Sequence, residues 1–456
     1  MKKISMIFVL LILSFAGIII AQQTPSKEYL ENYQQVMKRT EWWREARFGM
    51  FIHFGAYAVA AKGEWYKSND RLTTENYQKY IDAFSPTDFD AKKWAKAAKT
   101  AGMKYAVLTA KHHDGFCMFD SKLTDYKLSP NFGGRDLVRE FLDAFRAEGL
   151  KVGLYYSLID WHHPDYPNVG NHPQRDDKEY SKRQFNWENY LKYMHGQVEE
   201  LTKNYGKLDI LWFDYSFEDY RGEKWKAKEL VEMVRKNQPG VIIDNRLGEF
   251  ENTSSKGRLV GRYGDFETPE QGIPDSALVD IYGNQIPWET CLTLNNNWGY
   301  SEFDKAWKSP ELLIQCLVNC VSKNGNMLLN VGPDARGNIP PESIAILSEI
   351  GNWMECNKES IYGCGAAKLA KPDWGRFTQK GNALYAHWMY PNLLPLYIKR
   401  IGNKTKGAFL VSSGAELPFS FSWWNNNEPD NLFIEVTKTS AEKPIKYDTV
   451  IKIELK

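Results

Sequence analysis

Apolar runs and helical periodicity alternate along the first three quarters of the chain. Apolar runs without polar alternation are typical of strands buried on both faces. Alternation of such strands with helices, joined by short connections, favours a parallel sheet covered by helices. The expected strands cover residues 48–55, 105–110, 151–158, 208–215, 241–246 and 327–332, and the expected helices cover residues 29–45, 89–102, 136–149, 181–205, 223–237, 309–324 and 341–357.

More than four such units predict an α/β fold with a (β/α)8-like barrel, although the alternation is less regular between residues 250 and 300. The pattern changes at about residue 363, where short alternating runs are separated by Gly, Pro, Asn and Ser. Such runs predict an antiparallel β-sandwich. We therefore expect a barrel over residues 24–358 and a β-sandwich domain over residues 363–456.

The first residues have the pattern of a secretory signal peptide. Lys2 and Lys3 precede an apolar run over residues 6–20, and small or polar residues begin at Ala21. This pattern predicts a signal peptide over residues 1–21 and export, with the bacterial periplasm as the expected location and secretion as the alternative. Ile19 matches a cleavage site poorly, so an uncleaved anchor is the other interpretation. No later segment is apolar enough to suggest a membrane span.

Composition narrows the function only slightly. The formal net charge of +1 gives no reason to expect nucleic acid or an anionic membrane as a partner. The 16 Trp, 25 Tyr and 23 Phe residues suit stacking on sugar faces, although large cores also use aromatic residues. The six cysteines do not have the spacing of a disulfide framework. Oligomeric state is left open by the sequence.

Polar and aromatic residues gather where the expected strands end. Five of the eight histidines occur there, and the carboxyl ends of barrel strands are where catalysis takes place. Asp214, at the end of its strand, would alone be as well explained as a loop cap. The set as a whole favours a functional site. It comprises His53, Glu64, Trp65, His112, His113, Tyr155, Tyr156, Asp160, His162, His163, Trp212, Asp214 and Arg246.

A zinc site is one interpretation of these residues, because His and Asp are zinc ligands. Barrel metallohydrolases usually carry His-x-His on the first strand, whereas the first strand here ends with His53 alone. His112 and His113 are adjacent, so on a strand they would point to opposite faces and could not easily share one ion. We therefore expect neither a metal nor another cofactor.

A pair of carboxyl groups is the other interpretation. Glycoside hydrolysis needs one carboxylate beside the anomeric carbon and a second carboxyl group that donates a proton. Asp214 is the candidate for the first role. Glu267, Glu270 and Glu289 are candidates for the second, and the residues themselves do not choose among them.

Several ordered motifs between Trp42 and Asn357 resemble those of glycoside hydrolase family 29, the α-L-fucosidases. The β domain after residue 363 also fits the arrangement of that family. The resemblance implies an exo-acting retaining enzyme that removes terminal α-L-fucose from an oligosaccharide or glycoconjugate through a covalent glycosyl-enzyme intermediate. The motifs cover residues 43–55, 64–66, 110–116, 161–166, 211–214, 288–291, 297–300 and 325–333.

The same resemblance assigns roles. It implies that Asp214 is the nucleophile, and the loop over residues 268–270 is most similar to the acid/base loop of the family, which favours Glu270. Phe54 and Phe116 are the expected apolar contacts of the fucose methyl group. The expected substrate-binding residues are His53, Glu64, Trp65, His112, His113, Tyr156, Trp212, Arg246 and Trp298.

One position departs from the family pattern, since Tyr215 stands where the family usually has glycine after the nucleophile. A bulky residue there could narrow the pocket or alter leaving-group preference, so the linkage cleaved and the adjacent sugar stay open. Two alternatives are an exo-glycosidase acting on a galactose-configured sugar and a non-catalytic carbohydrate-binding barrel. The second is disfavoured by the presence of Asp214, Glu64 and the histidines.

Overall fold

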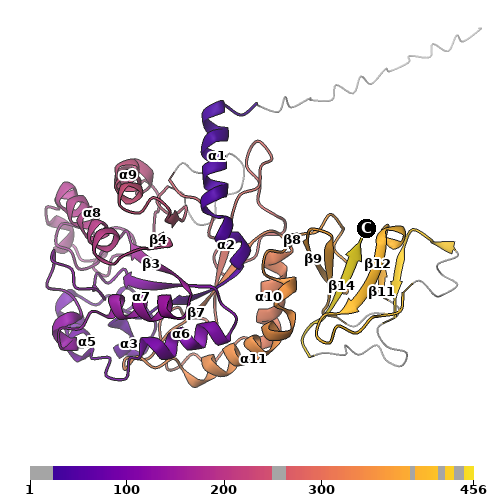
Figure 1. Cartoon of the computed structure of the whole chain (residues 1–456). Helices are drawn as coiled ribbons and strands as arrows, with labels where there is room; N and C mark the ends of the chain where they lie inside the picture. The colour runs from indigo at the N-terminus through magenta and orange to yellow at the C-terminus, as the bar shows by residue number, and fades with distance from the viewer. Residues whose placement is uncertain (1–23, 249–262, 391–395, 420–426, 436–445) are drawn as a thin grey trace, which may run out of the picture.

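The computed structural model describes residues 24–248, 263–390, 396–419, 427–435 and 446–456, so the expected signal peptide lies outside the described residues. The N-terminal part is built on a sheet of seven parallel strands in the order β5-β4-β3-β2-β1-β7-β6 (Figure 1). Within the described ranges, no helix is long and apolar enough to cross a membrane. The strands are β1 (Phe48–Ile52), β2 (Tyr105–Lys111), β3 (Lys151–Ser157), β4 (Ile210–Asp214), β5 (Ile242–Ile243), β6 (Glu289–Thr293) and β7 (Asn326–Val331).

A segment that is not a regular strand lies between β5 and β6. Residues 265–270 occupy this position, and isolated parallel bridges join them to both neighbours. The bridges pair Asp244 with Phe266, Glu267 with Trp288 and Glu270 with Cys291. With this segment the sheet has eight positions, which confirms the predicted (β/α)8-like architecture. The irregular pairing of residues 265–270 accounts for part of the less regular alternation between residues 250 and 300.

Helices cover the outside of the sheet (Figure 1). Side chains of each strand alternate between the barrel interior and the layer beneath the helices. Phe51 and Trp212 lie in the interior cluster, whereas Met50 and Leu211 pack beneath the helices. The helices are α1 (Lys27–Arg39), α2 (Glu41–Ala46), α3 (Tyr57–Ala60), α4 (Tyr66–Asn69), α5 (Thr74–Ala83), α6 (Ala91–Thr100), α7 (Leu137–Ala147), α8 (Trp187–Asn204), α9 (Ala227–Asn237), α10 (Pro310–Val321) and α11 (Pro341–Asn357).

Local capping determines where several of these helices begin. The side chain of Asp90 accepts hydrogen bonds from the first turn of α6, Asp136 caps α7, and Asn186 caps α8. Replacing such a residue with Ala typically costs about 1 kcal/mol. The caps therefore fix where the loops that follow the strands end, and these loops carry the polar residues predicted to form a site.

The C-terminal part is an antiparallel β-sandwich, as predicted. One sheet has the order β12-β14-β10-β9-β8, and β11 pairs with β13. The two sheets share a core that contains Trp374, Leu384, Trp388 and Ile434. The strands are β8 (Gly365–Ala366), β9 (Gly375–Lys380), β10 (Ala383–Trp388), β11 (Leu396–Ile398), β12 (Thr405–Leu410), β13 (Leu432–Ile434) and β14 (Thr449–Leu455).

The β-sandwich lies against α10 and α11 of the barrel (Figure 1). Tyr385 and Val450 belong to the hydrophobic cluster that continues beneath the barrel helices. Arg376 Nε donates a hydrogen bond to Asn319 Oδ1 at 2.9 Å. The β domain thus supports the barrel from its helical layer.

Candidate active site

A cavity of about 110 Å³ lies at the carboxyl end of the barrel strands. Most of the site residues predicted from the sequence line it. The exceptions are Glu64, Tyr156, Asp160, His162, His163, Glu267 and Glu289. The lining residues are Phe51, His53, Trp65, His112, His113, Tyr155, Trp212, Asp214, Tyr215, Arg246, Glu270, Cys291 and Trp298.

Asp214 is the last residue of β4, and both of its oxygens are hydrogen-bonded. Tyr155 Oη donates to Oδ2 at 2.6 Å, and Arg246 Nη1 donates to Oδ1 at 2.6 Å. Burial by itself would raise the pKa of Asp214, but the Arg246 charge, His113 and the Tyr155 hydrogen bond lower it below its usual value. Asp214 is therefore held as a carboxylate, which is the state a nucleophile requires.

The Arg246 guanidinium joins Asp214 to Glu270. Its Nη2 donates to Glu270 Oε2 at 2.8 Å, and Trp298 Nε1 donates to Glu270 Oε1 at 3.2 Å. Arg246 is 2% exposed, and its Nε donates to Thr268 Oγ1 at 2.9 Å. Because the two carboxylates bind the two terminal nitrogens of one planar, immobilised group, they are held close together across the cavity.

Glu267 was an alternative to Glu270 in the sequence, and the structure places it outside the cavity. Side chains of the closing segment alternate, so that Phe266 lies in the barrel interior and Glu267 points to the opposite side. There Glu267 Oε2 accepts a hydrogen bond from Asn245 Nδ2 at 2.7 Å. Glu267 therefore does not face Asp214.

Glu289, the other alternative, lies inside the barrel but at the opposite end. It is the first residue of β6, and its Oε2 accepts hydrogen bonds from Trp43 Nε1 at 3.2 Å and from Tyr105 Oη. It is fully buried, and burial raises its pKa to about 7 despite these donors. Of the three glutamates, Glu270 is the one that lines the cavity with Asp214.

Three histidines line one side of the cavity. The rings of His112 and His113 have centroids 4.1 Å apart, so the prediction that they point to opposite faces was wrong. Strand alternation does not extend to them, because β2 ends at Lys111 and its register shifts at that point. Burial lowers the pKa of His53 to about 3 and that of His113 to about 4, so both are neutral near pH 7.

Tyr156 was predicted to bind substrate, but its neighbour Tyr155 is the tyrosine that lines the cavity. Neighbouring residues of a strand face opposite sides, and Tyr155 lies in the interior cluster with Trp212, its partner in register. Tyr156 points outward, where its Oη donates to Gln197 Oε1 at 2.7 Å. The alternation of β3 relative to β4 was the signal that would have favoured Tyr155 over Tyr156 as the residue facing the cavity.

The predicted apolar contacts also lie elsewhere. Phe54 packs against Phe84 and Trp94, and Phe116 packs against Phe84, so both belong to the layer between the sheet and its helices. The apolar lining is instead supplied in part by Phe51 of β1. Its inward direction follows from the alternation that also points His53 into the cavity.

Glu64 lies behind the lining rather than in it, while its neighbour Trp65 faces the cavity. Glu64 Oε2 accepts a hydrogen bond from the backbone N–H of Gly299 at 2.7 Å. Burial raises the pKa of Glu64 to about 7, although this hydrogen bond opposes the shift. Glu64 thus fixes the loop that carries Trp298.

Tyr215 adopts a backbone conformation that is unfavourable for a residue with a side chain, with φ at 77°. Its ring packs edge-on against His113 at 4.9 Å and near Trp65 at 5.6 Å. Asn171 Nδ2 donates a hydrogen bond to its Oη. Tyr215 therefore forms part of the cavity lining despite backbone strain of about 1–3 kcal/mol.

The donor set of the cavity is unsuited to a cation. The part of the chain that the structure describes has no group of three or more His, Cys, Asp or Glu side chains placed to hold a metal ion. Asp214, which lies 3.8 Å from His113, is already bound by Arg246, whose positive charge would repel a metal. The arrangement instead suits a neutral ligand with several hydroxyl groups.

Comparisons with known proteins agree with this geometry. A family model described as Alpha-L-fucosidase matches residues 17–359. An α-L-fucosidase of Dictyostelium discoideum is 31% identical over 396 residues, which cover 80% of this chain and 78% of the relative.

Solved structures are similar over most of the chain. The α-L-fucosidase isoenzyme 1 from Paenibacillus thiaminolyticus is 52% identical with a TM-score of 0.89, covering 92% of this chain and 100% of the other. An α-L-fucosidase from Bacteroides thetaiotaomicron, trapped as a covalent intermediate with 2-fluoro-fucosyl fluoride, is 29% identical with a TM-score of 0.79. The match covers 92% of this chain and 96% of the other. The chain belongs to the α-L-fucosidase family of glycoside hydrolases.

Proposed function

We propose that this chain is an exported, exo-acting, retaining α-L-fucosidase in which Asp214 is the nucleophile and Glu270 the acid/base. The observation that carries the proposal is the Arg246 guanidinium bound to both carboxylates at 2.6 and 2.8 Å. Retaining glycosidases hold their two carboxyl groups about 5–5.5 Å apart, whereas inverting enzymes need room for a water molecule between them. A shared guanidinium favours the shorter spacing.

In the first step, Asp214 attacks the anomeric carbon of the terminal fucose. The bond from that carbon to the glycosidic oxygen breaks, and protonated Glu270 donates its proton to the departing oxygen. The product is a covalent glycosyl ester on Asp214 together with the released alcohol of the remaining glycan. Arg246 and Tyr155 keep Asp214 ionised before the attack and fix its orientation.

In the second step, Glu270 has become a carboxylate and acts as a base. It removes a proton from water, the water oxygen bonds to the anomeric carbon, and the ester bond to Asp214 breaks. Fucose leaves with its original anomeric configuration, and both carboxyl groups return to their starting states. The Bacteroides thetaiotaomicron relative trapped as a covalent intermediate supports this route.

The small cavity supports an exo-acting enzyme. A space of about 110 Å³ enclosed by Trp65, Trp212 and Trp298 suits one terminal sugar rather than an internal stretch of a glycan. Aromatic rings can pack on the apolar face of a sugar, while the histidines can form hydrogen bonds with its hydroxyl groups. A fucosylated oligosaccharide or glycoconjugate is therefore the proposed substrate.

The decisive experiment compares Asp214→Asn with Asp209→Asn, a carboxylate just before the amino end of the same strand. Asp214→Asn is expected to lower kcat/KM for an aryl α-L-fucoside by about 10⁴-fold or more, because the nucleophile is lost. Asp209→Asn should remain close to wild type. Full activity of Asp214→Asn would refute the assigned mechanism.

Two further measurements separate the alternatives. NMR of the first product formed should show the α anomer of fucose, whereas an inverting enzyme would release the β anomer. A panel of aryl glycosides tests the galactose-configured alternative, and fucose binding without turnover by the wild type would favour a carbohydrate-binding protein. Determination of the N-terminus of the mature protein in the periplasm tests export.

A further inference from the structure

Two side chains behind the cavity, Ser157 and Asn330, contact the Nδ1 atoms of two cavity histidines. Ser157 Oγ lies 2.8 Å from His113 Nδ1, and Asn330 Oδ1 lies 2.7 Å from His53 Nδ1. Ser157 is fully buried and Asn330 is 2% exposed. Neither was predicted from the sequence, and the reaction steps above do not use them.

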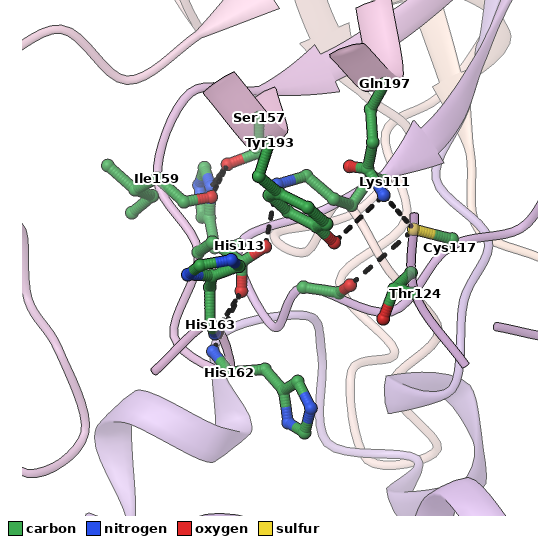
Figure 2. A network of polar contacts seen from close by, with 12 residues as sticks. Lys111, His113, Cys117, Thr124, Ser157, Ile159, His162, His163, Tyr193 and Gln197 are labelled. Carbon is green, nitrogen blue, oxygen red and sulfur yellow. Dashed lines mark hydrogen bonds and ion pairs between the residues drawn. The ribbon is translucent and has the colours of Figure 1, made fainter. Parts of the chain in front are cut away.

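The partners of Ser157 determine which nitrogen of His113 carries the proton. Ser157 Oγ donates to the backbone carbonyl of Ile159 at 2.7 Å, and a carbonyl oxygen can only accept (Figure 2). The single hydroxyl proton of Ser157 is therefore committed to Ile159. The contact with His113 is a hydrogen bond only if Nδ1 carries the proton and donates it to Oγ. The Nε2 atom of neutral His113 then has a free lone pair.

Asn330 applies the same constraint to His53. Its Nδ2 donates to the backbone carbonyl of Trp298 at 2.7 Å, which fixes the orientation of the amide. Oδ1 therefore faces His53, and His53 Nδ1 must donate to it. Two independent contacts thus produce the same tautomer in both imidazoles.

We propose that Ser157 and Asn330 are positioning residues that hold His113 and His53 as hydrogen-bond acceptors toward the substrate. The consequence is a rule of substrate specificity. The cavity selects a sugar whose hydroxyl groups donate hydrogen bonds to Nε2 of His113 and Nε2 of His53. His113 Nε2 lies 3.8 Å from Asp214 Oδ2. If Nε2 carried the proton, it could donate to the nucleophile, and the fixed tautomer prevents this competition.

The backbone around His113 is held as firmly as its ring. Trp161 N–H donates to the carbonyl of His113 at 2.8 Å. Asp160, next to Trp161, pairs with Lys111 at 2.9 Å, and both side chains are almost fully buried. Figure 2 shows Lys111 and His113 in this network beside Ser157 and Ile159. The ion pair therefore fixes the loop on which the Ser157 contact depends.

The first test is the tautomer itself, measured in the full-length wild-type protein by ¹⁵N NMR of labelled histidine rings. His113 and His53 are expected to show protonated Nδ1 and unprotonated Nε2. In Ser157→Ala, His113 should gain a population protonated at Nε2, while His53 should not change. Protonated Nε2 in the wild type, or an identical His113 spectrum in Ser157→Ala, would overturn the proposal.

The second test uses activity and rests on the proposed function. Loss of one ordered hydrogen bond is worth about 1 kcal/mol, so kcat/KM of Ser157→Ala for an aryl α-L-fucoside should fall about five- to tenfold. Ser157→Thr retains the hydroxyl group and should restore most of the activity. Ser360→Ala is the matched control, because Ser360 is equally buried and also donates to a backbone carbonyl, that of Asn357.

A substrate series makes this test specific to hydrogen-bond direction. A fluorine in place of a sugar hydroxyl can accept a hydrogen bond but cannot donate one. The analogue with fluorine in place of the hydroxyl that faces His113 should therefore be a poor substrate for the wild type. That penalty should shrink about threefold or more in Ser157→Ala, where Nε2 can donate. An equal penalty in both enzymes would contradict the proposal. Failure of the wild type to cleave any fucoside would instead contradict the proposed function, and the NMR result would still decide the tautomers.

Discussion

The two ends of the barrel interior each contain a buried carboxyl group, and the two groups behave in opposite ways. At the carboxyl end, Arg246 and Tyr155 lower the pKa of Asp214. At the amino end, Glu289 receives hydrogen bonds from the neutral side chains of Trp43 and Tyr105, and burial raises its pKa to about 7. Both carboxyl groups are removed from water, so the charged guanidinium makes the difference.

This contrast shows how the proposed catalytic carboxylate differs from a buried carboxyl group with a structural role. A carboxylate with a cationic partner stays ionised and can act as a nucleophile. A carboxyl group with neutral donors is readily protonated, and its hydrogen bonds connect the side chains of the barrel interior. Burial alone therefore does not identify a catalytic carboxyl group, whereas the charge of its hydrogen-bond partners does.

Among the tests of this comparison, the largest expected effect separates Glu270 from Glu289. Glu270→Gln should lower kcat/KM for a fucosyl disaccharide by about 10²–10⁴-fold, because the leaving oxygen loses its proton donor. The loss should be smaller for an aryl fucoside whose leaving group needs no proton. Glu289→Gln, the matched control inside the same barrel, should stay within about threefold of wild type. If Glu289→Gln lost this activity and Glu270→Gln retained it, the acid/base would be Glu289, at the amino end of the barrel.

The next effect tests the role of the Arg246 charge. Arg246→Met should reduce kcat/KM by about 10²–10³-fold, since a charged donor to the proposed nucleophile is lost. Without the positive charge the pKa of Asp214 rises, so the acidic limb of the pH profile should move to higher pH.

A matched control exists for this arginine. Arg235 pairs with Asp265 at 2.5 Å, at the edge of the closing segment and outside the cavity. Arg235→Met should lower stability without moving the acidic limb. If the two variants shifted the limb equally, the Arg246 charge would not be what keeps Asp214 ionised.

A third prediction concerns stability at the amino end. The pKa of Glu289 is raised from 4.5 to about 7 in the folded protein, so its favourable contribution is complete below pH 4.5 and is lost as pH rises through 7. Glu289→Gln imitates the protonated form and lacks this titration. Relative to the variant, wild type should lose about 3 kcal/mol of unfolding free energy between pH 4.5 and pH 8.

Denaturant unfolding of both proteins at several pH values measures this difference. Glu64, whose pKa is also raised to about 7, is present in both proteins and so cancels in the comparison. Parallel pH dependences of the two proteins would show that Glu289 does not titrate in this range.

The smallest expected effect tests the backbone strain at Tyr215, beside Asp214. Ala is normally more stabilising than Gly, but at Tyr215, with φ at 77°, the order should be reversed. Tyr215→Gly should unfold with a free energy about 1 kcal/mol higher than that of Tyr215→Ala. At Tyr397, within strand β11, the same pair of substitutions should show the ordinary order. An ordinary order at Tyr215 would exclude a strained backbone there.

Much of the fold could be predicted from the sequence, because buried parallel strands and amphipathic helices leave strong periodic patterns. The helix expected at 341–357 is observed as α11 with the same bounds. The closing segment over residues 265–270 could not be predicted as a strand, since only isolated bridges pair it with its neighbours. The β-sandwich was predictable because its short strands alternate and are separated by turn residues.

The candidate site was predicted less completely, and several misses concern the direction of side chains on or near strands. Strand alternation, read correctly, points Tyr155 inward and Tyr156 outward, and Glu267 to the outer side of the closing segment. The same alternation fails for His112 and His113, because the strand ends before them. The direction of a side chain depends on where the regular backbone stops, and this is set by pairing with neighbouring strands.

The sequence by itself determined the layer architecture and the position of Asp214 as the acid at the carboxyl end of β4. Those properties are local, since periodicity and end signals are written in consecutive residues. Only the tertiary structure decided that Glu270 faces Asp214 while Glu289 lies at the other end, and that one guanidinium spans the two. These facts depend on the register of distant strands, which brings together residues that no local pattern relates.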